Sequence, residues 1–165
     1  MPETIRFAFA ESALGRMLVA VSDAGVCFAT FGESDAAARD ALAARFPSAM
    51  LVEVQAAVLP EAAAVAALAT EPSGPLPDLD LRGTDFQRGV WAALLEIPAG
   101  STITYGELAA RVGRPSAFRA AATACGANPV ALAVPCHRVV GASGALSGYR
   151  WGVERKRALL ESERR

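Results

Sequence analysis

Pro135-Cys136-His137-Arg138-Val139 is the stretch from which the fold and chemistry of this 165-residue chain are most directly predicted. It holds the only histidine of the sequence, directly beside one of the three cysteines. A thiol becomes a nucleophile when it ionises, and an adjacent imidazole or cation promotes that ionisation. The apolar run 130–134 precedes the stretch and the loop 141–144 follows it. Cys136 is therefore predicted to lie where a buried extended segment enters a turn, a common place for reactive groups.

A packing role is the alternative for Cys136, because most cysteines are small buried apolar side chains. Adjacent residues of an extended chain also point to opposite faces, so neighbourhood in sequence does not guarantee contact. Cys27 and Cys125 are predicted to be packing residues of this kind. The three cysteines are widely spaced and form no CxxC pair, which favours a reducing compartment and makes a metal site unexpected.

Charge is distributed unevenly along the chain. Residues 1–81 hold four Arg against eleven Asp and Glu, a net −7, whereas residues 82–165 hold twelve Arg and Lys against six Asp and Glu, a net +6. The basic half contains Cys136, which suggests that this part faces a polyanion, although a basic surface without a partner is the alternative. No apolar run approaches the roughly 20 residues of a membrane span, and a signal-peptide pattern is lacking. We therefore expect a cytoplasmic protein without membrane contact.

Alternating apolar residues between positions 4 and 31 predict three short antiparallel strands. Two Ala-rich segments, 35–46 and 60–69, have helical composition. The Pro- and Gly-containing segment 72–77 then interrupts regular structure. These patterns predict an N-terminal α/β lobe with its linker at residues 1–78 and a second domain at residues 79–165.

The second domain is predicted to be mostly helical. Thr84 and Gln87 form a capping-box pattern that begins a helix, and Thr104 with Glu107 repeats the pattern for a helix that ends near Gly113. A further helix is predicted to begin at Ser116. Such helix–turn–helix units serve either protein packing or contact with nucleic acid.

Small residues dominate this further helix and surround one long cation, Arg119, which permits close approach to another backbone. The final helix is predicted at residues 153–163. Its helical wheel places Glu163 on the inward side with Leu159 and Leu160. An inward carboxylate needs a partner, and His137 is the natural one; a solvent-exposed C-terminal glutamate is the alternative.

The quoted stretch, preceded by Asn128-Pro129 and followed by Gly148-Tyr149, resembles the active-site signature of the O6-alkylguanine-DNA alkyltransferases. Segment 146–153 and Phe86-Gln87 are most similar to the C-terminal domain of bacterial adaptive-response (Ada) proteins. The resemblance implies an α+β fold. The expected N-terminal lobe has a three-stranded antiparallel sheet and helices, ribonuclease H-like, and the C-terminal lobe is mostly helical with a winged-helix-like helix-turn-helix.

The same resemblance implies direct DNA repair, in which Cys136 accepts the alkyl group of O6-alkylguanine, and also of O4-alkylthymine, in one irreversible turnover. No cofactor or metal is expected. The expected partner of a monomeric protein is double-stranded DNA, entered through the minor groove, with the damaged base flipped out. Arg119 would take the place of that base in the stack.

Site residues follow from the resemblance position by position. The implied catalytic residues are Cys136, His137, Glu163 and Tyr105. The implied DNA-binding residues are Arg119, Tyr105, Thr104, Ala120 and Arg138. The implied substrate pocket consists of Asn128, Pro135, Val139, Tyr149, Arg150 and Trp151, with the Trp151 indole narrowing it in favour of methyl groups.

The sequence leaves two alternative functions open. One is an alkyltransferase-like sensor that binds flipped O6-alkylguanine without transferring the group, although such proteins replace the cysteine that this chain keeps. The other is a thiol hydrolase that uses Cys136 and His137, which leaves Arg119 and the helix pair without a role.

Overall fold

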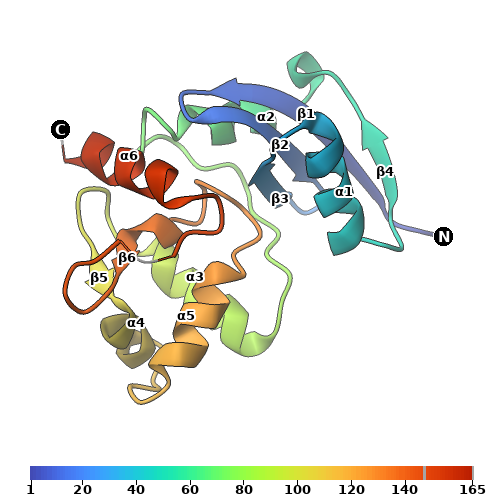
Figure 1. Cartoon of the computed structure of the whole chain (residues 1–165). Helices are drawn as coiled ribbons and strands as arrows, with labels where there is room; N and C mark the ends of the chain where they lie inside the picture. The colour runs from blue at the N-terminus through green and yellow to red at the C-terminus, as the bar shows by residue number, and fades with distance from the viewer. Residues whose placement is uncertain (147, 165) are drawn as a thin grey trace. The chain divides into compact units, whose positions relative to one another are not determined.

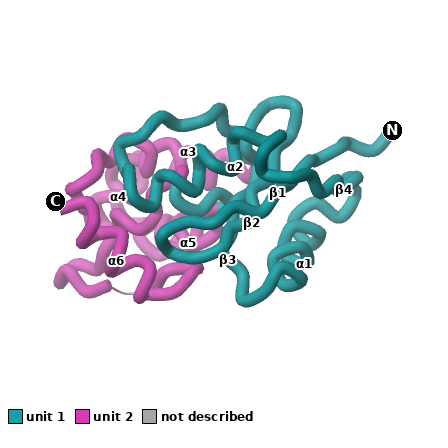
Figure 2. Tube along the Cα trace, turned by 90° about the horizontal axis from the view of Figure 1, so that it is seen from above, with its two compact units in different colours: residues 1–81, 129–132 teal, residues 82–128, 133–165 magenta. Residues whose placement is uncertain are grey.

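The computed structural model describes residues 1–146 and 148–164; Ser147 of the quoted flanking segment and Arg165 of the expected second domain lie outside the described residues. The chain forms two compact units, coloured separately in Figure 2. Unit 1 contains Met1–Leu81 and Pro129–Leu132, and unit 2 contains Arg82–Asn128 and the chain from Ala133 onward. Residues 129–132 belong to unit 1 although they follow the first part of unit 2 in the chain, which a single boundary in the sequence cannot describe. The expected domain boundary after residue 78 stays a prediction.

A four-stranded mixed sheet forms the centre of unit 1 (Figure 1). Strands β1 (Thr4–Ser12), β2 (Gly15–Val21) and β3 (Val26–Phe31) pair antiparallel, as their alternating apolar residues predict. Strand β4 (Met50–Glu53) adds to β1 in parallel, which gives the order β3-β2-β1-β4. The centre of β2, from Met17 to Val21, is buried throughout, so this strand is covered on both faces.

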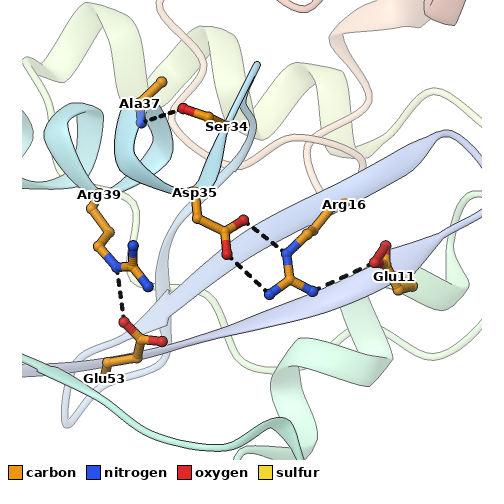
Figure 3. A network of polar contacts seen from close by, with 7 residues as sticks. All are labelled: Glu11, Arg16, Ser34, Asp35, Ala37, Arg39 and Glu53. Atoms are coloured by element: carbon orange, nitrogen blue, oxygen red, sulfur yellow. Dashed lines mark hydrogen bonds and ion pairs between the residues drawn. The ribbon is translucent and has the colours of Figure 1, made fainter.

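Helices α1 (Asp35–Arg45) and α2 (Pro60–Ala67), with the short 3-10 helix η1 (Ala56–Val58), complete unit 1. Ala38 and Leu42 of α1 pack with Ile5 and Phe7 of β1 in one apolar core. Polar contacts fix the same helix at the surface (Figure 3). There Arg16 of β2 contacts Asp35, and Arg39 contacts Glu53, both at 2.8 Å. Because these pairs are exposed, we expect apolar packing to stabilise unit 1 far more than they do.

Unit 2 consists of four α-helices among the described residues, together with short segments: α3 (Asp85–Leu95), α4 (Tyr105–Arg111), α5 (Phe118–Gly126), α6 (Val153–Glu163), η2 (Cys136–Arg138), β5 (Ile103–Thr104) and β6 (Val139–Val140). Both predicted capping boxes are present at the starts of α3 and α4. Trp91 of α3 is fully buried and donates from Nε1 to the Ala124 carbonyl of α5 at 2.9 Å, which locks these two helices together. The parallel β5–β6 pairing then holds the start of α4 beside the residues that follow Cys136.

The α+β class is confirmed, with two corrections. The sheet is four-stranded and mixed rather than three-stranded and antiparallel, since the edge segment Met50–Glu53 pairs with β1 in parallel. The sequence did not indicate this strand because the segment is short, largely exposed and shows no apolar alternation. Helix α5 begins at Phe118 rather than Ser116. The reason is a tight turn, closed by a 2.8 Å bond from Ala117 N–H to the Arg114 carbonyl, that places Pro115 and Ser116 before the helix.

None of the helices formed by the described residues has the combined length and hydrophobicity that spanning a membrane requires. All three cysteines are buried thiols.

Candidate active site

Cys136 begins the 3-10 turn η2 and is only 5% exposed. Its backbone N–H donates to the Val134 carbonyl at 2.8 Å, and the Val139 N–H donates back to the Cys136 carbonyl. The nucleophile candidate therefore lies in a buried, hydrogen-bonded turn rather than at an exposed one.

Asn128 is fully buried next to this turn and fixes it through its side-chain amide. Nδ2 donates to the Val134 carbonyl at 2.8 Å, which is the structural tie that the family resemblance implies. The same nitrogen donates to Cys136 Sγ at 3.2 Å, a contact that the sequence does not reveal. A donor aimed at sulfur favours the thiolate over the thiol.

Cys125, predicted as a packing residue, is buried beside Cys136 and donates from Sγ to the Cys136 carbonyl at 3.7 Å. Hydrogen bonding from the Cys125 thiol lowers the pKa of Cys136; burial opposes this effect, and Asn128 and the charge of Lys156 support it. The same pairing, together with burial, raises the pKa of Cys125. Of the two thiols, Cys136 is therefore the more acidic.

His137 and Glu163 are in direct contact, with 2.6 Å between Nε2 and Oε2. Both side chains are buried, at 3% and 2% exposure. Burial lowers the pKa of His137 against the raising effect of Glu163, so the imidazole is neutral at neutral pH. A neutral ring that donates Nε2–H to the carboxylate carries its lone pair on Nδ1. Nδ1 is buried and has no hydrogen-bond partner within the described residues, so it is available to accept a proton.

Arg138, which the resemblance places among the DNA-binding residues, is buried and paired with Glu163, and its contact with DNA stays a prediction. Its guanidinium is buried and bonds Glu163 through Nε at 2.9 Å and Nη2 at 3.0 Å, and the Ile97 carbonyl through Nη1 at 2.6 Å. Burial raises the pKa of Glu163, but hydrogen bonds from His137 and Arg138 outweigh it and lower that pKa to about 2. Arg138 therefore keeps Glu163 ionised and aimed at His137.

Lys156 is a site residue that the sequence analysis missed. It is completely buried in α6, where Nζ donates to the Val139 carbonyl at 2.6 Å and to the Gly148 carbonyl at 3.1 Å. Its position three residues before Leu159 on the inward stripe of α6 is the signal that could have found it. Burial lowers the pKa of Lys156, while the two thiols raise it. The ammonium group both holds the segment after Cys136 and favours the thiolate.

A cavity of about 430 Å³ opens at Cys136 and is lined by Tyr105, Ala122, Cys125, Gly126, Cys136, Gly148, Tyr149 and Arg150. Small-molecule sites commonly have volumes of about 300–1,000 Å³, so this one is large enough for a purine base. Tyr105, the first residue of α4, is half-buried here, and burial, followed by the two nearby thiols, raises its pKa to about 12. Its hydroxyl is therefore a hydrogen-bond donor at neutral pH.

Tyr149 lines this cavity, and within the described residues its buried hydroxyl has no hydrogen-bond partner. Burial raises the pKa of the Tyr149 hydroxyl well above its usual value. Trp151 was expected to line the cavity but is not among its lining residues. Its indole packs edge-on against Tyr149, with 5.3 Å between the ring centres. Arg150 lines it and is anchored by a 2.9 Å bond from Nη1 to the Asn128 carbonyl.

Three further residues expected in the pocket, Asn128, Pro135 and Val139, are buried around the turn and are not part of the lining. Their contacts explain why. Asn128 and Val139 use their polar groups to hold the turn, and Pro135 precedes it as the cap of η2. They shape the backbone that presents Cys136 rather than the wall of the cavity.

Apart from Arg138, the residues expected to contact DNA lie at the start of α4, where Thr104 is the cap and Tyr105 the first residue, and on α5. Arg119 and Ala120 are exposed on α5. Thr104 is the cap of α4, and its Oγ1 accepts the Glu107 N–H at 3.1 Å, so its hydroxyl is engaged within the protein. Ala122, Cys125 and Gly126 of α5 line the cavity, so the helix that carries Arg119 also forms a wall of the Cys136 site.

Unit 2 thus brings together a thiol with a lowered pKa, a neutral histidine with an available lone pair and a cavity large enough for a purine base, a combination that suits a protein with a cysteine nucleophile. Residues 85–165 match the family model described as the DNA-binding domain of 6-O-methylguanine DNA methyltransferase. The structure is similar to that of Mycobacterium tuberculosis OGT in complex with DNA, with TM-score 0.77 and 38% identity over 96% of this chain and 92% of that chain. This chain belongs to the O6-methylguanine-DNA methyltransferase family.

Curated relatives agree with this membership. The regulatory protein ada of Salmonella typhimurium is 47% identical over 161 residues, which cover 97% of this chain and 46% of that protein. A methylated-DNA--protein-cysteine methyltransferase of Mycobacterium bovis is 62% identical over 87 residues, 53% of each chain. The chain thus spans about half the length of the curated relatives that it matches.

Proposed function

We propose that this protein repairs DNA directly by transferring the alkyl group of O6-alkylguanine to Cys136. The observation that carries the proposal is the position of the Cys136 thiol, which lines a purine-sized cavity, accepts a hydrogen bond from the Asn128 amide and directly precedes His137, the partner of Glu163, in the chain. A thiolate attacks an alkyl carbon by in-line displacement, so no oxyanion site is needed. The resulting thioether has no good leaving group, and each protein molecule should therefore act once.

Proton transfer begins the reaction. His137 Nδ1 takes the thiol proton of Cys136 through a bridging water, and Glu163 stabilises the imidazolium that forms. The sulfur–carbon bond then forms while the bond between that carbon and guanine O6 breaks. Negative charge develops on the departing guanine, and the Tyr105 hydroxyl, protonated at neutral pH, donates a hydrogen bond to it. The departing guanine takes up one proton, which balances the proton that the thiol gave to His137, so the products are S-alkylcysteine and unmodified guanine.

Helix α5 is the proposed DNA-contacting element, in a winged-helix-like pair with α4 that approaches the minor groove of double-stranded DNA. Its exposed residues are Arg119, the small residues Ala120, Thr123 and Gly126, and Phe118 at its first position. Extruding a nucleotide costs a few kcal/mol, and a guanidinium plane can replace part of the lost stacking. We propose that a monomer inserts Arg119 while the extruded base enters the cavity that α5 lines, and that O4-alkylthymine enters in the same way.

A titration of protein against duplex DNA tests the proposal. With O6-methylguanine in excess, repaired guanine should rise linearly with protein and stop at one lesion per protein molecule. Cys136→Ser should bind the duplex and repair none, because a hydroxyl is far less ionised than a thiol. Binding without any repair by the unmodified protein would instead identify a sensor, and continued turnover would identify a hydrolytic enzyme; either result would overturn the proposal.

A further inference from the structure

Phe118 is an exposed aromatic residue on the proposed DNA-binding helix. Within the described part of the chain, the large apolar residues with exposed surface are Met1, Met50, Val52, Val58, Leu76 and Phe118. Phe118 is the one aromatic residue in this set and is 50% exposed. A phenyl ring that stays in water forgoes the hydrophobic free energy that its burial would supply. Its exposure therefore suggests a ligand that covers the ring.

The position of Phe118 on α5 relates it to the cavity. Phe118 is the first residue of the helix, and Ala122, which lines the cavity, follows one turn later. Residues four apart lie on the same helical face, and helical side chains lean toward the N-terminus. The ring of Phe118 therefore extends the cavity-lining row of Ala122, Cys125 and Gly126 by one turn, to the rim of the site.

Arg119 lies next to Phe118, about 100° further around the helix. The guanidinium carbon of Arg119 is 5.9 Å from the centre of the Phe118 ring, so the two exposed side chains lie close together. The surrounding helix pair has a net positive charge, since the exposed charged residues between Tyr105 and Asn128 are Glu107, Arg111, Arg114 and Arg119. An aromatic ring within a basic surface fits a nucleic acid better than an apolar protein partner.

We propose that Phe118 is a second DNA-contacting wedge, which packs on the base beside the extruded nucleotide while Arg119 fills the vacated place. The inference rests on the proposed function and adds a positioning residue to it. The Phe118 ring covers the DNA strand on the cavity side of Arg119. It thereby prevents the damaged nucleotide from returning to the base stack. Architectural proteins use apolar wedges in the minor groove in this way, and base–aromatic stacking tolerates any sequence because every base has a π-face.

The test compares Phe118→Ala, Phe118→Tyr and the control Leu76→Ala, which removes an equally exposed apolar side chain in unit 1. Rates of methyl transfer to Cys136 are measured with duplex DNA containing O6-methylguanine and with the free base O6-methylguanine. We expect Phe118→Ala to slow the duplex reaction about 5- to 150-fold, the range implied by loss of one stacking contact. Phe118→Tyr keeps the ring and should stay near the wild-type rate, as should Leu76→Ala. The free base, which needs no extrusion, should react equally with all four proteins.

Two results would overturn the inference while leaving the proposed function intact. One is a duplex rate for Phe118→Ala equal to that of Leu76→Ala. The other is an equal loss with duplex and free base, which would show that the ring supports the protein's own structure. If the wild-type protein transfers no methyl group from either substrate, the proposed function fails and this inference fails with it.

Discussion

Replacing Glu163 by Gln tests the buried charge cluster that orients His137. The carboxylate is 2% exposed and accepts two hydrogen bonds from Arg138 and one from His137. Glutamine keeps the shape but removes the charge, which leaves the Arg138 guanidinium buried without its counter-ion. Breaking one partner of a buried ion pair costs about 3–5 kcal/mol. We therefore expect Glu163→Gln to lower the free energy of unfolding by about 3 kcal/mol at pH 7.

The pKa of Glu163 gives a second route to the magnitude. It falls from 4.5 to about 2 on folding, and each unit corresponds to about 1.4 kcal/mol, so the sum is again about 3 kcal/mol. Because the folded-state pKa is the lower one, this stabilisation is fully present above pH 4.5 and is lost as pH falls toward 2. The stability difference between wild type and variant should therefore be constant near neutral pH and shrink as the pH falls through this window.

Urea unfolding at several pH values measures this difference, with Glu161→Gln as the matched control because Glu161 is exposed on the same helix. The control should lie within about 0.5 kcal/mol of wild type. Methyl transfer by Glu163→Gln should also slow about 10- to 100-fold, since His137 loses its orienting acceptor. If Glu163→Gln unfolds at the same urea concentration as Glu161→Gln at every pH, the reasoning about the buried cluster is wrong.

Three further substitutions probe other parts of the site. Arg119→Ala should slow repair of duplex DNA while the free modified base still reacts at the wild-type rate, and equal losses on both would show that Arg119 does not support base extrusion. Lys156→Met should lower the free energy of unfolding by about 2 kcal/mol, because its charge-assisted hydrogen bonds are lost. It should also raise the pKa of Cys136, measured by thiolate absorbance against pH. An unchanged titration curve would show that the charge of Lys156 does not favour the thiolate. Trp151→Gly should speed alkylation by O6-benzylguanine, because Tyr149 loses its edge-on support and the cavity can widen; equal rates for wild type and variant would show that Trp151 does not limit the cavity.

Local patterns predicted the parts of this fold that depend on local physics. The helical wheel placed Glu163 inward because its neighbours Leu159 and Leu160 set the buried stripe, and the structure has it buried against His137. Both capping boxes were read from residues only three positions apart. Strand β4 was missed because an exposed edge strand lacks the alternation by which strands are recognised.

Contacts between distant residues are where the sequence was insufficient. Arginine side chains usually lie at the surface, so the sequence alone suggested an exposed Arg138. Only the fold shows that Arg138 is buried and paired with the carboxylate of Glu163, 25 residues later. Lys156 was overlooked because lysine is rarely buried, and its carbonyl partners leave no trace in residue type. Cys125 was expected to pack, which its burial bears out, but its hydrogen bond at Cys136 depends on how α5 meets the 3-10 turn.

Peptide-level mass spectrometry after incubation with duplex DNA containing O6-methylguanine tests the central claim most directly. Residues 120–138 contain no Lys or Arg before Arg138, so Cys125 and Cys136 share one tryptic peptide and fragmentation must locate the added group. We expect one added methyl group on Cys136, none on Cys125 or Cys27, and no added methyl group anywhere in Cys136→Ser. A methyl group on Cys125 or another residue, or repaired DNA with an unmodified Cys136, would contradict the assignment of Cys136 as the acceptor.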